Sequence, residues 1–150
     1  MMCGPSGSGK STWAKRYTIL HPRTEIVSTD AIREELFGDA SVQSNPQKVF
    51  GLAHKRLKRL LDNGHNVIFD AMNLSPKDRR AIVAEYKRIY PALVCICVVM
   101  RADFDKCIEH QSMRDRKVPS DVIKNQFNRF QRPTLDEGWD IIATDNTLLI

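Results

Sequence analysis

The stretch Gly4-Pro5-Ser6-Gly7-Ser8-Gly9-Lys10-Ser11 decides the fold of this 150-residue chain. It satisfies the pattern G-x-x-x-x-G-K-[S/T], and the residues after it predict a helix from about Lys10 to Leu20. The glycines let the backbone curl so that several N–H groups point inward, while the helix N-terminus adds partial positive charge. We therefore predict a P-loop that holds the phosphates of ATP or GTP.

The side chains at the end of the loop suit the same ligand. Lys10 supplies a positive charge to the β- and γ-phosphates, and the Ser11 hydroxyl can ligate Mg²⁺. A chance Gly/Ser-rich turn is disfavoured, because the lysine and the hydroxyl would then be coincidental. The expected cofactors are ATP and Mg²⁺. The residues expected to bind the nucleotide are Gly4, Pro5, Ser6, Gly7, Ser8, Gly9, Lys10, Ser11 and Thr12.

The rest of the chain alternates short apolar runs with longer helical stretches, which is typical of crossover units and a parallel sheet. The expected strands are 24–28, 66–70, 92–100 and 141–143, and the expected helices are 10–20, 30–37, 47–62, 76–90, 103–113 and 119–129. Met1 to Cys3 would be a truncated first strand. We expect an α/β fold of the P-loop NTPase type, with about five parallel strands and helices on both faces.

Size and composition limit the possible classes of protein. A chain with 42% hydrophobic and 27% charged residues is an ordinary globule, and we expect one kinase-like domain over residues 1–150, excised from a longer protein or complete. Four cysteines without a signal peptide indicate reduced thiols and a cytoplasmic location, and no membrane partner is expected. The net charge of +5 favours anionic partners; the oligomeric state is left open.

A second motif narrows the reaction. Asp30 follows the predicted strand 24–28, at the end where open parallel sheets bind ligands, and Arg33 lies one helical turn further on. A carboxylate there can accept the proton of an attacking hydroxyl, and an arginine can hold an anionic acceptor. The alternative is that Asp30 only caps the helix and Arg33 is an exposed helix charge.

Two further segments carry candidate site residues. The apolar run Val67 to Asp70 has the form of a Walker B strand, whose aspartate usually contacts Mg²⁺, and Asn73 follows in the same loop. The basic connection Arg114-Asp115-Arg116-Lys117 can fold over a nucleotide and neutralise charge on the transferring phosphoryl group. A simple turn aspartate and a solvated loop are the respective alternatives.

Taken in order, four motifs resemble the 5′-kinase domain of phage and bacterial polynucleotide kinases. They are GPSGSGKSTWA (4–14), STDAIR (28–33), DAMNLSP (70–76) and RDRKVPSDVI (114–123). The P-loop alone is shared with many families, whereas its combination with D-x-x-R, D-x-x-N and an arginine-rich segment is far more specific. The resemblance covers most of the chain and implies an adenylate-kinase-like fold that transfers the γ-phosphate of ATP to a 5′-hydroxyl of DNA or RNA.

The resemblance also implies roles for individual residues. Asp30 would be the general base, and Arg33 would hold the phosphate of the acceptor. Asp70 matches a position that binds either the metal or the acceptor. Asn73, in the same loop, is expected to contact the substrate. Arg114 and Arg116 both match the catalytic arginine of the lid, with Arg116 preferred. Lys10 and Ser11 would serve ATP and Mg²⁺.

The sequence is also compatible with two other functions. The same module resembles kinases of small hydroxylated metabolites, such as sugars or nucleosides, which would keep every catalytic residue. The chain could also be a nucleotide-binding protein without catalysis, in which Asp30 and Arg33 are structural. A phosphatase or ligase domain, often joined to this kinase domain in the family, has no counterpart among these residues.

Overall fold

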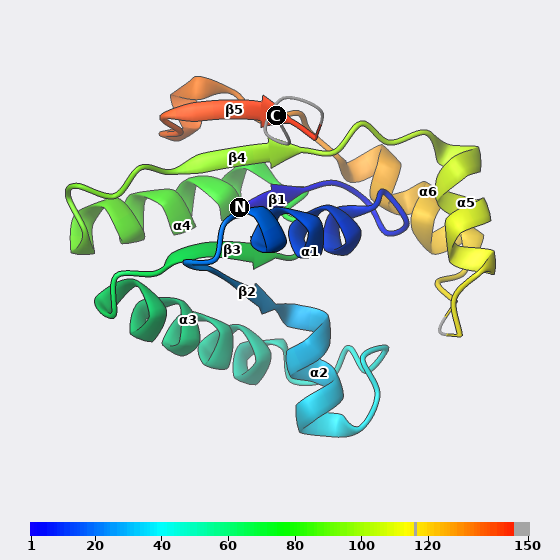
Figure 1. The fold of residues 1–150 in the computed structure, drawn as a ribbon. Coiled ribbons are helices and arrows are strands. Elements are labelled where there is room, and N and C mark those ends of the chain that lie inside the picture. Colours follow the sequence, from blue (N-terminus) through cyan, green and yellow to red (C-terminus); the bar gives the residue numbers. More distant parts are fainter. Residues whose placement is uncertain (116, 146–150) are drawn as a thin grey trace. The chain divides into compact units, whose positions relative to one another are not determined.

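We describe residues 1–115 and 117–145 of the chain in a computed structural model (Figure 1). The elements in chain order are β1 (Met2–Cys3), α1 (Lys10–Leu20), β2 (Thr24–Ser28), α2 (Thr29–Phe37), α3 (Pro46–Asp62), β3 (Asn66–Asp70), α4 (Pro76–Ile89), β4 (Ile96–Val99), α5 (Phe104–Ser112), α6 (Ser120–Arg129), the 3₁₀ helix η1 (Leu135–Glu137) and β5 (Ile141–Thr144). Every strand pair in the described part of the chain is parallel. The α/β class with parallel strands flanked by helices is therefore confirmed.

The chain divides into two compact units, and each is described separately. One unit contains residues 1–10 and 72–150, and the other contains residues 11–71. Accordingly, the strands form two sheets, β1-β4-β5 in the first unit and β2-β3 in the second. The P-loop glycines and Lys10 thus belong to the first unit, and Ser11 opens the second.

In the second unit, β2 and β3 pair in register from Thr24 with Asn66 to Ser28 with Asp70. Helix α3 packs against both strands and buries one residue at every fourth position, namely Val49, Ala53 and Leu57. This spacing places the three side chains on one face of the helix. The result is that β2 and β3 end at the same edge, where α2 begins.

In the first unit, β4 lies between β1 and β5. The core on this sheet contains Cys97 and Val99 of β4, Cys3 of β1, Val83 of α4 and Trp139. Because Cys3 immediately precedes Gly4, this core fixes the start of the P-loop. Even a two-residue strand therefore suffices to anchor the loop.

The predicted strand 92–100 is longer than the strand in the structure. The run 92–100 was expected to be extended throughout, but β4 comprises only Ile96–Val99. Leu93 N donates to Tyr90 O in a turn after α4, and Cys95 N donates to the Asp140 carboxylate at 2.7 Å. These bonds take the chain out of the ladder before Ile96, although its side chains are apolar enough for a strand.

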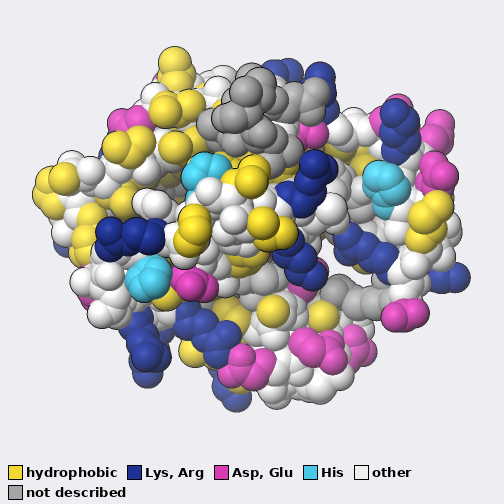
Figure 2. All heavy atoms as spheres, in the orientation of Figure 1, with side chains coloured by type: hydrophobic (Ala, Val, Ile, Leu, Met, Phe, Trp, Pro, Cys, Tyr) yellow, Lys and Arg dark blue, Asp and Glu magenta, His cyan; other side chains and the backbone are white. Residues whose placement is uncertain are grey.

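Burial and charge agree with the composition. All four cysteines are free and buried. On the face drawn in Figure 2, Lys and Arg side chains lie among Asp and Glu side chains. Within residues 1–115 and 117–145, no helix is long and apolar enough to cross a membrane.

Candidate active site

Two glycines with positive φ angles turn the backbone of the P-loop. Gly7 and Gly9 have φ angles of 80° and 89°, in the left-handed region that favours glycine, and α1 begins at the next residue, Lys10. Gly7 also lies so close to α5 that a Cβ atom would be 2.5 Å from Cys107 O. The loop therefore depends on glycine here for both its turn and its packing.

Lys10 is buried and bound to the loop itself. Its Nζ donates to Gly4 O at 2.8 Å and to Pro5 O at 2.7 Å. Nearby in the loop, Ser8 Oγ is buried and has no hydrogen-bond partner among the described residues. A cation and an unsatisfied hydroxyl within a curled glycine-rich loop fit an anionic ligand such as a nucleotide phosphate.

In the second unit, the start of α1 contacts the end of β3. Ser11 Oγ donates to Asp70 Oδ2 at 2.8 Å, and Asp70 is only 6% exposed. No cluster of three or more potential metal-binding side chains occurs among the described residues. One hydroxyl and one carboxylate are the oxygen donors that Mg²⁺ uses beside nucleotide phosphates, so this pair fits that metal.

The predicted acceptor residues lie at the same edge of the second unit. Ser28, the last residue of β2, pairs with Asp70 and caps α2 by accepting from Ala31 N at 3.4 Å. Asp30 follows in the first turn of α2 and forms an ion pair with Arg33 at 3.1 Å. The strand register thus brings Asp30, Arg33, Asp70 and Ser11 to one end of β2 and β3.

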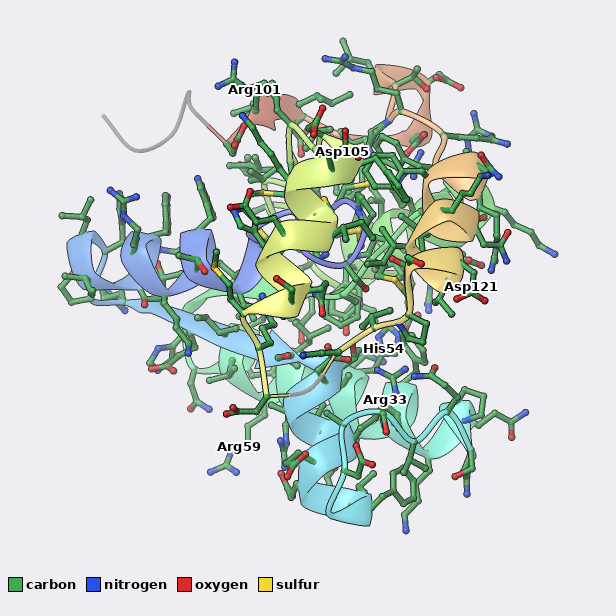
Figure 3. All side chains as sticks on the ribbon, turned by 90° about the vertical axis from the view of Figure 1, so that its right-hand side faces the viewer. Arg33, His54, Arg59, Arg101, Asp105 and Asp121 are labelled. Carbon is green, nitrogen blue, oxygen red and sulfur yellow. The ribbon has the colours of Figure 1, made fainter. Side chains whose placement is uncertain are left out.

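The two members of this ion pair differ in exposure. The Asp30 side chain is 60% exposed, whereas that of Arg33 is 11% exposed. Figure 3 shows Arg33 on α2 and His54 on α3, both in the second unit. Arg33 therefore has a fixed position, while the Asp30 carboxylate is accessible to a ligand.

Other predicted residues have different surroundings. Thr12 is exposed on α1. Asn73 has a positive φ angle of 50°, and its Nδ2 donates to Met2 O at 2.7 Å, so it joins the loop after β3 to β1. Arg114 is exposed after α5, with its N bound to Gln111 O. Arg116 lies outside the described residues, and its role stays a prediction.

Sequence reasoning missed three side chains that contact the P-loop or the residues before it. Gln126 Oε1 of α6 accepts from Ser6 N at 2.8 Å, and the His110 ring of α5 contacts Gly7 O at 2.9 Å. Arg79 of α4 is fully buried, and its Nη1 donates to the sulfur of Cys3, the residue before the loop, at 3.8 Å and to Asn73 O at 2.9 Å. These three side chains lie 76 to 120 residues away in sequence from the P-loop atoms and the Cys3 sulfur that they contact, so no local pattern signals the contacts.

Arg79 holds this region through an ion pair. Its Nη2 and Nε donate to the two carboxylate oxygens of Glu137 at 2.6 and 2.7 Å, and Trp139 Nε1 donates to the same carboxylate at 3.0 Å. Such a two-point pair with satisfied hydrogen bonds is the arrangement that makes a buried charge tolerable. It fixes the loop that leads from β3 to α4.

Comparison with known proteins identifies the family. A model described as AAA domain (AAA_33) matches residues 1–133, which include the four sequence motifs and every helix and strand through α6, but neither η1 nor β5. The chain belongs to the AAA domain family. This AAA domain also has the fold of P-loop kinases, as the following similarities show.

The AAA domain is similar to one curated kinase over nearly its whole length. It is 26% identical to the L-seryl-tRNA(Sec) kinase of Methanococcus maripaludis over 153 residues, which cover 98% of this chain and 58% of the kinase. This chain thus spans about three-fifths of the length of that relative.

Two solved structures share the fold. A chain of the Pnkp1/Rnl/Hen1 RNA repair complex superposes with a TM-score of 0.75 at 22% identity, over 85% of the AAA domain and 42% of that chain. A gluconokinase from Sinorhizobium meliloti gives a TM-score of 0.62 at 17% identity, over 95% of the AAA domain and 78% of that chain. A chain of an RNA repair complex and a gluconokinase therefore share the P-loop kinase fold with this AAA domain.

Proposed function

We propose that this chain is an ATP-dependent kinase domain that transfers the γ-phosphate to the 5′-hydroxyl of a nucleic-acid end. The observation that carries the proposal is the gathering of Ser11, Asp30, Arg33 and Asp70 at one end of β2 and β3. An accessible carboxylate can accept a proton from the hydroxyl of a second substrate, and the neighbouring arginine, whose side chain is 11% exposed, can hold an anionic group of that substrate.

The nucleotide would be held by the P-loop. Backbone N–H groups of Gly7, Gly9 and the start of α1 would face the phosphates, because Pro5 has no N–H and those of Gly4 and Ser6 donate to Met72 O and Gln126 Oε1. Lys10 would leave its loop carbonyls to bind the β- and γ-phosphates. Ser11 and Asp70 would hold Mg²⁺, which stabilises the charge that develops on the phosphate oxygens.

The acceptor would be activated by Asp30. Its carboxylate accepts the proton of the acceptor hydroxyl while the oxygen of that hydroxyl bonds to the γ-phosphorus. The bond between this phosphorus and the β–γ bridging oxygen breaks, and ADP leaves. Arg33 would hold an anionic group of the acceptor, and Arg114 or Arg116 would neutralise charge on the moving phosphoryl group.

Several similarities support a nucleic-acid acceptor. The RNA repair complex and the seryl-tRNA kinase both have RNA in their names, and the net charge of +5 favours a polyanion. Arg33 beside Asp30 suits an acceptor that carries a phosphate next to its hydroxyl. We also propose that the chain acts in the cytoplasm, where its four free thiols stay reduced.

A small hydroxylated metabolite is the second candidate acceptor. The gluconokinase likeness favours it, because it extends over 78% of that protein, compared with 42% for the RNA repair chain. Such an acceptor would use the same base, metal and P-loop. The two candidates differ only in what Arg33 and the surrounding surface recognise.

An acceptor panel distinguishes these candidates. ADP release from ATP would be measured with a 5′-hydroxyl RNA oligonucleotide, the same oligonucleotide with a 5′-phosphate, L-seryl-tRNA and gluconate. We expect the 5′-hydroxyl oligonucleotide to stimulate ADP release and its 5′-phosphorylated form to have no effect. Stimulation by gluconate alone would assign the chain to the metabolite kinases, and stimulation by seryl-tRNA alone would move the acceptor to an aminoacyl group.

A further inference from the structure

In the first unit, both polar groups of the peptide that joins Pro5 to Ser6 form hydrogen bonds to side chains. Its carbonyl oxygen accepts from Lys10 Nζ at 2.7 Å, and its N–H donates to Gln126 Oε1 at 2.8 Å. One side chain that binds this peptide is the P-loop lysine, and the other comes from α6, 120 residues away. The peptide therefore links α6 to the lysine.

Peptide geometry makes this link stiff. A trans peptide is planar, with its C=O and N–H pointing in opposite directions, and the described residues contain no cis peptide bond. A hydrogen bond that fixes the N–H direction consequently fixes the carbonyl direction as well. Gln126 thus helps to fix where Pro5 O points, together with Ser8 N, which donates to the same oxygen at 3.4 Å. Pro5 O is in turn one of the atoms that position Lys10 Nζ.

Gln126 lies on α6, which packs against α5. Its side chain is in a residue only 8% exposed, and Phe127 beside it packs edge-on against Phe104 of α5, with ring centroids 5.6 Å apart. Helix α5 in turn contacts the loop through the close approach of Gly7 to Cys107 and through His110. Since Gly7 O must accept, His110 Nδ1 carries the proton in this contact.

We propose that Gln126 is a positioning residue for Lys10, acting through the Pro5–Ser6 peptide. The inference rests on the nucleotide site proposed above. When Lys10 moves from the loop carbonyls to a phosphate, the bond from Ser6 N–H to Gln126 keeps the peptide in place. The loop then needs no reordering as the phosphate binds, and this pre-organisation strengthens binding.

The hydrogen bond between Gln126 and Ser6 N also connects the P-loop to the helix that follows the basic segment, residues 114–118. This segment joins α5 to α6, and Gln111 of α5 binds both Arg114 N, through its carbonyl, and Val118 N, through its side chain. Both helices next to the segment therefore contact the P-loop, through His110 and Gln126. Figure 3 shows these helices, with Asp105 and Asp121 labelled in their first turns.

A double-mutant cycle on nucleotide affinity tests the inference. We expect Gln126→Met to weaken ATP and ADP binding about tenfold, because Ser6 N–H loses its partner. In a Lys10→Met background the same change should cost less than about twofold, because the lysine that it positions is gone. Asn128→Leu, an exposed amide on the same helix, is the matched control and should have no effect.

Hydrogen exchange of the Ser6 amide provides a second readout that does not depend on binding. The amide should be protected in the wild type, exchange faster in Gln126→Met, and remain protected in Gln126→Glu, which keeps an acceptor oxygen. Equal losses from Gln126→Met in both backgrounds, or unchanged Ser6 exchange, would overturn the inference alone. A wild-type chain that binds no nucleotide would overturn the inference and the proposed function together.

Discussion

The Ser11 hydroxyl donates to Asp70 Oδ2 across 2.8 Å, which joins the first turn of α1 to the end of β3. In the proposed reaction both oxygens hold Mg²⁺. Asp70→Asn keeps an oxygen that can accept from Ser11 but removes the negative charge. We expect the transfer rate at 1 mM Mg²⁺ to fall by at least about 100-fold and to recover partly as Mg²⁺ is raised. A rate that is reduced equally at every Mg²⁺ concentration would remove Asp70 from the metal site.

Asp30 is expected to act on the acceptor hydroxyl and to leave nucleotide binding alone. Asp30→Asn should lower kcat by about 100- to 10,000-fold, the usual contribution of a general base, and change the affinity for ATP less than about twofold. Glu25→Gln, which removes one exposed carboxylate from β2, is the matched control. Steady-state kinetics with titrated ATP separates the two effects. Unchanged kcat in Asp30→Asn would support a structural role for this residue.

Arg33 is expected to affect acceptor binding more than chemistry. Arg33→Met removes a guanidinium that is 11% exposed, and charge-assisted hydrogen bonds of this kind contribute about 1.5–3 kcal/mol. The KM for the acceptor should therefore rise about 10- to 100-fold, while the KM for ATP stays the same. Arg88→Met makes the same charge change on the exposed side of α4 and serves as the control. A larger effect on ATP than on the acceptor would contradict the assignment.

The buried pair of Arg79 and Glu137 is expected to stabilise the first unit in a pH-dependent way. Burial by itself raises the pKa of Glu137, but the hydrogen bonds from Arg79 and Trp139 outweigh it and hold the pKa below the ordinary 4.5. The stabilisation is then present above pH 4.5 and is lost as the pH falls through the lowered pKa of the folded state. Urea unfolding between pH 7 and pH 3 should show this loss.

Removing one partner of the pair provides the matching mutational test. Arg79→Met leaves the Glu137 charge buried without its partner and should lower the free energy of unfolding by about 3–5 kcal/mol at pH 7. Replacing both residues by apolar ones should restore much of the stability and remove the contribution of the pair to the pH dependence. An unchanged urea midpoint in Arg79→Met would show that the pair contributes little.

The periodic parts of the fold could be predicted because their signals are local. Helix α1 was expected at Lys10 to Leu20 and β3 at Asn66 to Asp70, and both have these bounds. Glycine after Phe37 and proline at 46 mark the end of α2 and the start of α3. The strand 92–100 was overestimated because a hydrophobic run does not reveal that Asp140 takes the Cys95 N–H.

The candidate site was predictable only where chemistry follows from a motif. The P-loop pattern specifies Lys10 and Ser11, and a strand ending in aspartate specifies Asp70. Gln126 could not be found in this way, since a glutamine on an amphipathic helix looks the same whether it contacts solvent or a backbone N–H 120 residues away. Arg79 was likewise indistinguishable from the exposed Arg80 beside it, although only Arg79 is buried.

The most direct test of the central claim is transfer of labelled γ-phosphate from ATP to a 5′-hydroxyl RNA oligonucleotide, measured for the wild type and for Asp30→Asn. We predict label on the 5′ end of the oligonucleotide with the wild type and no label on an oligonucleotide that already carries a 5′-phosphate. With Asp30→Asn we predict a loss of at least about 100-fold. Absence of label from every nucleic-acid acceptor, with a protein that binds ATP and phosphorylates a metabolite, would contradict it.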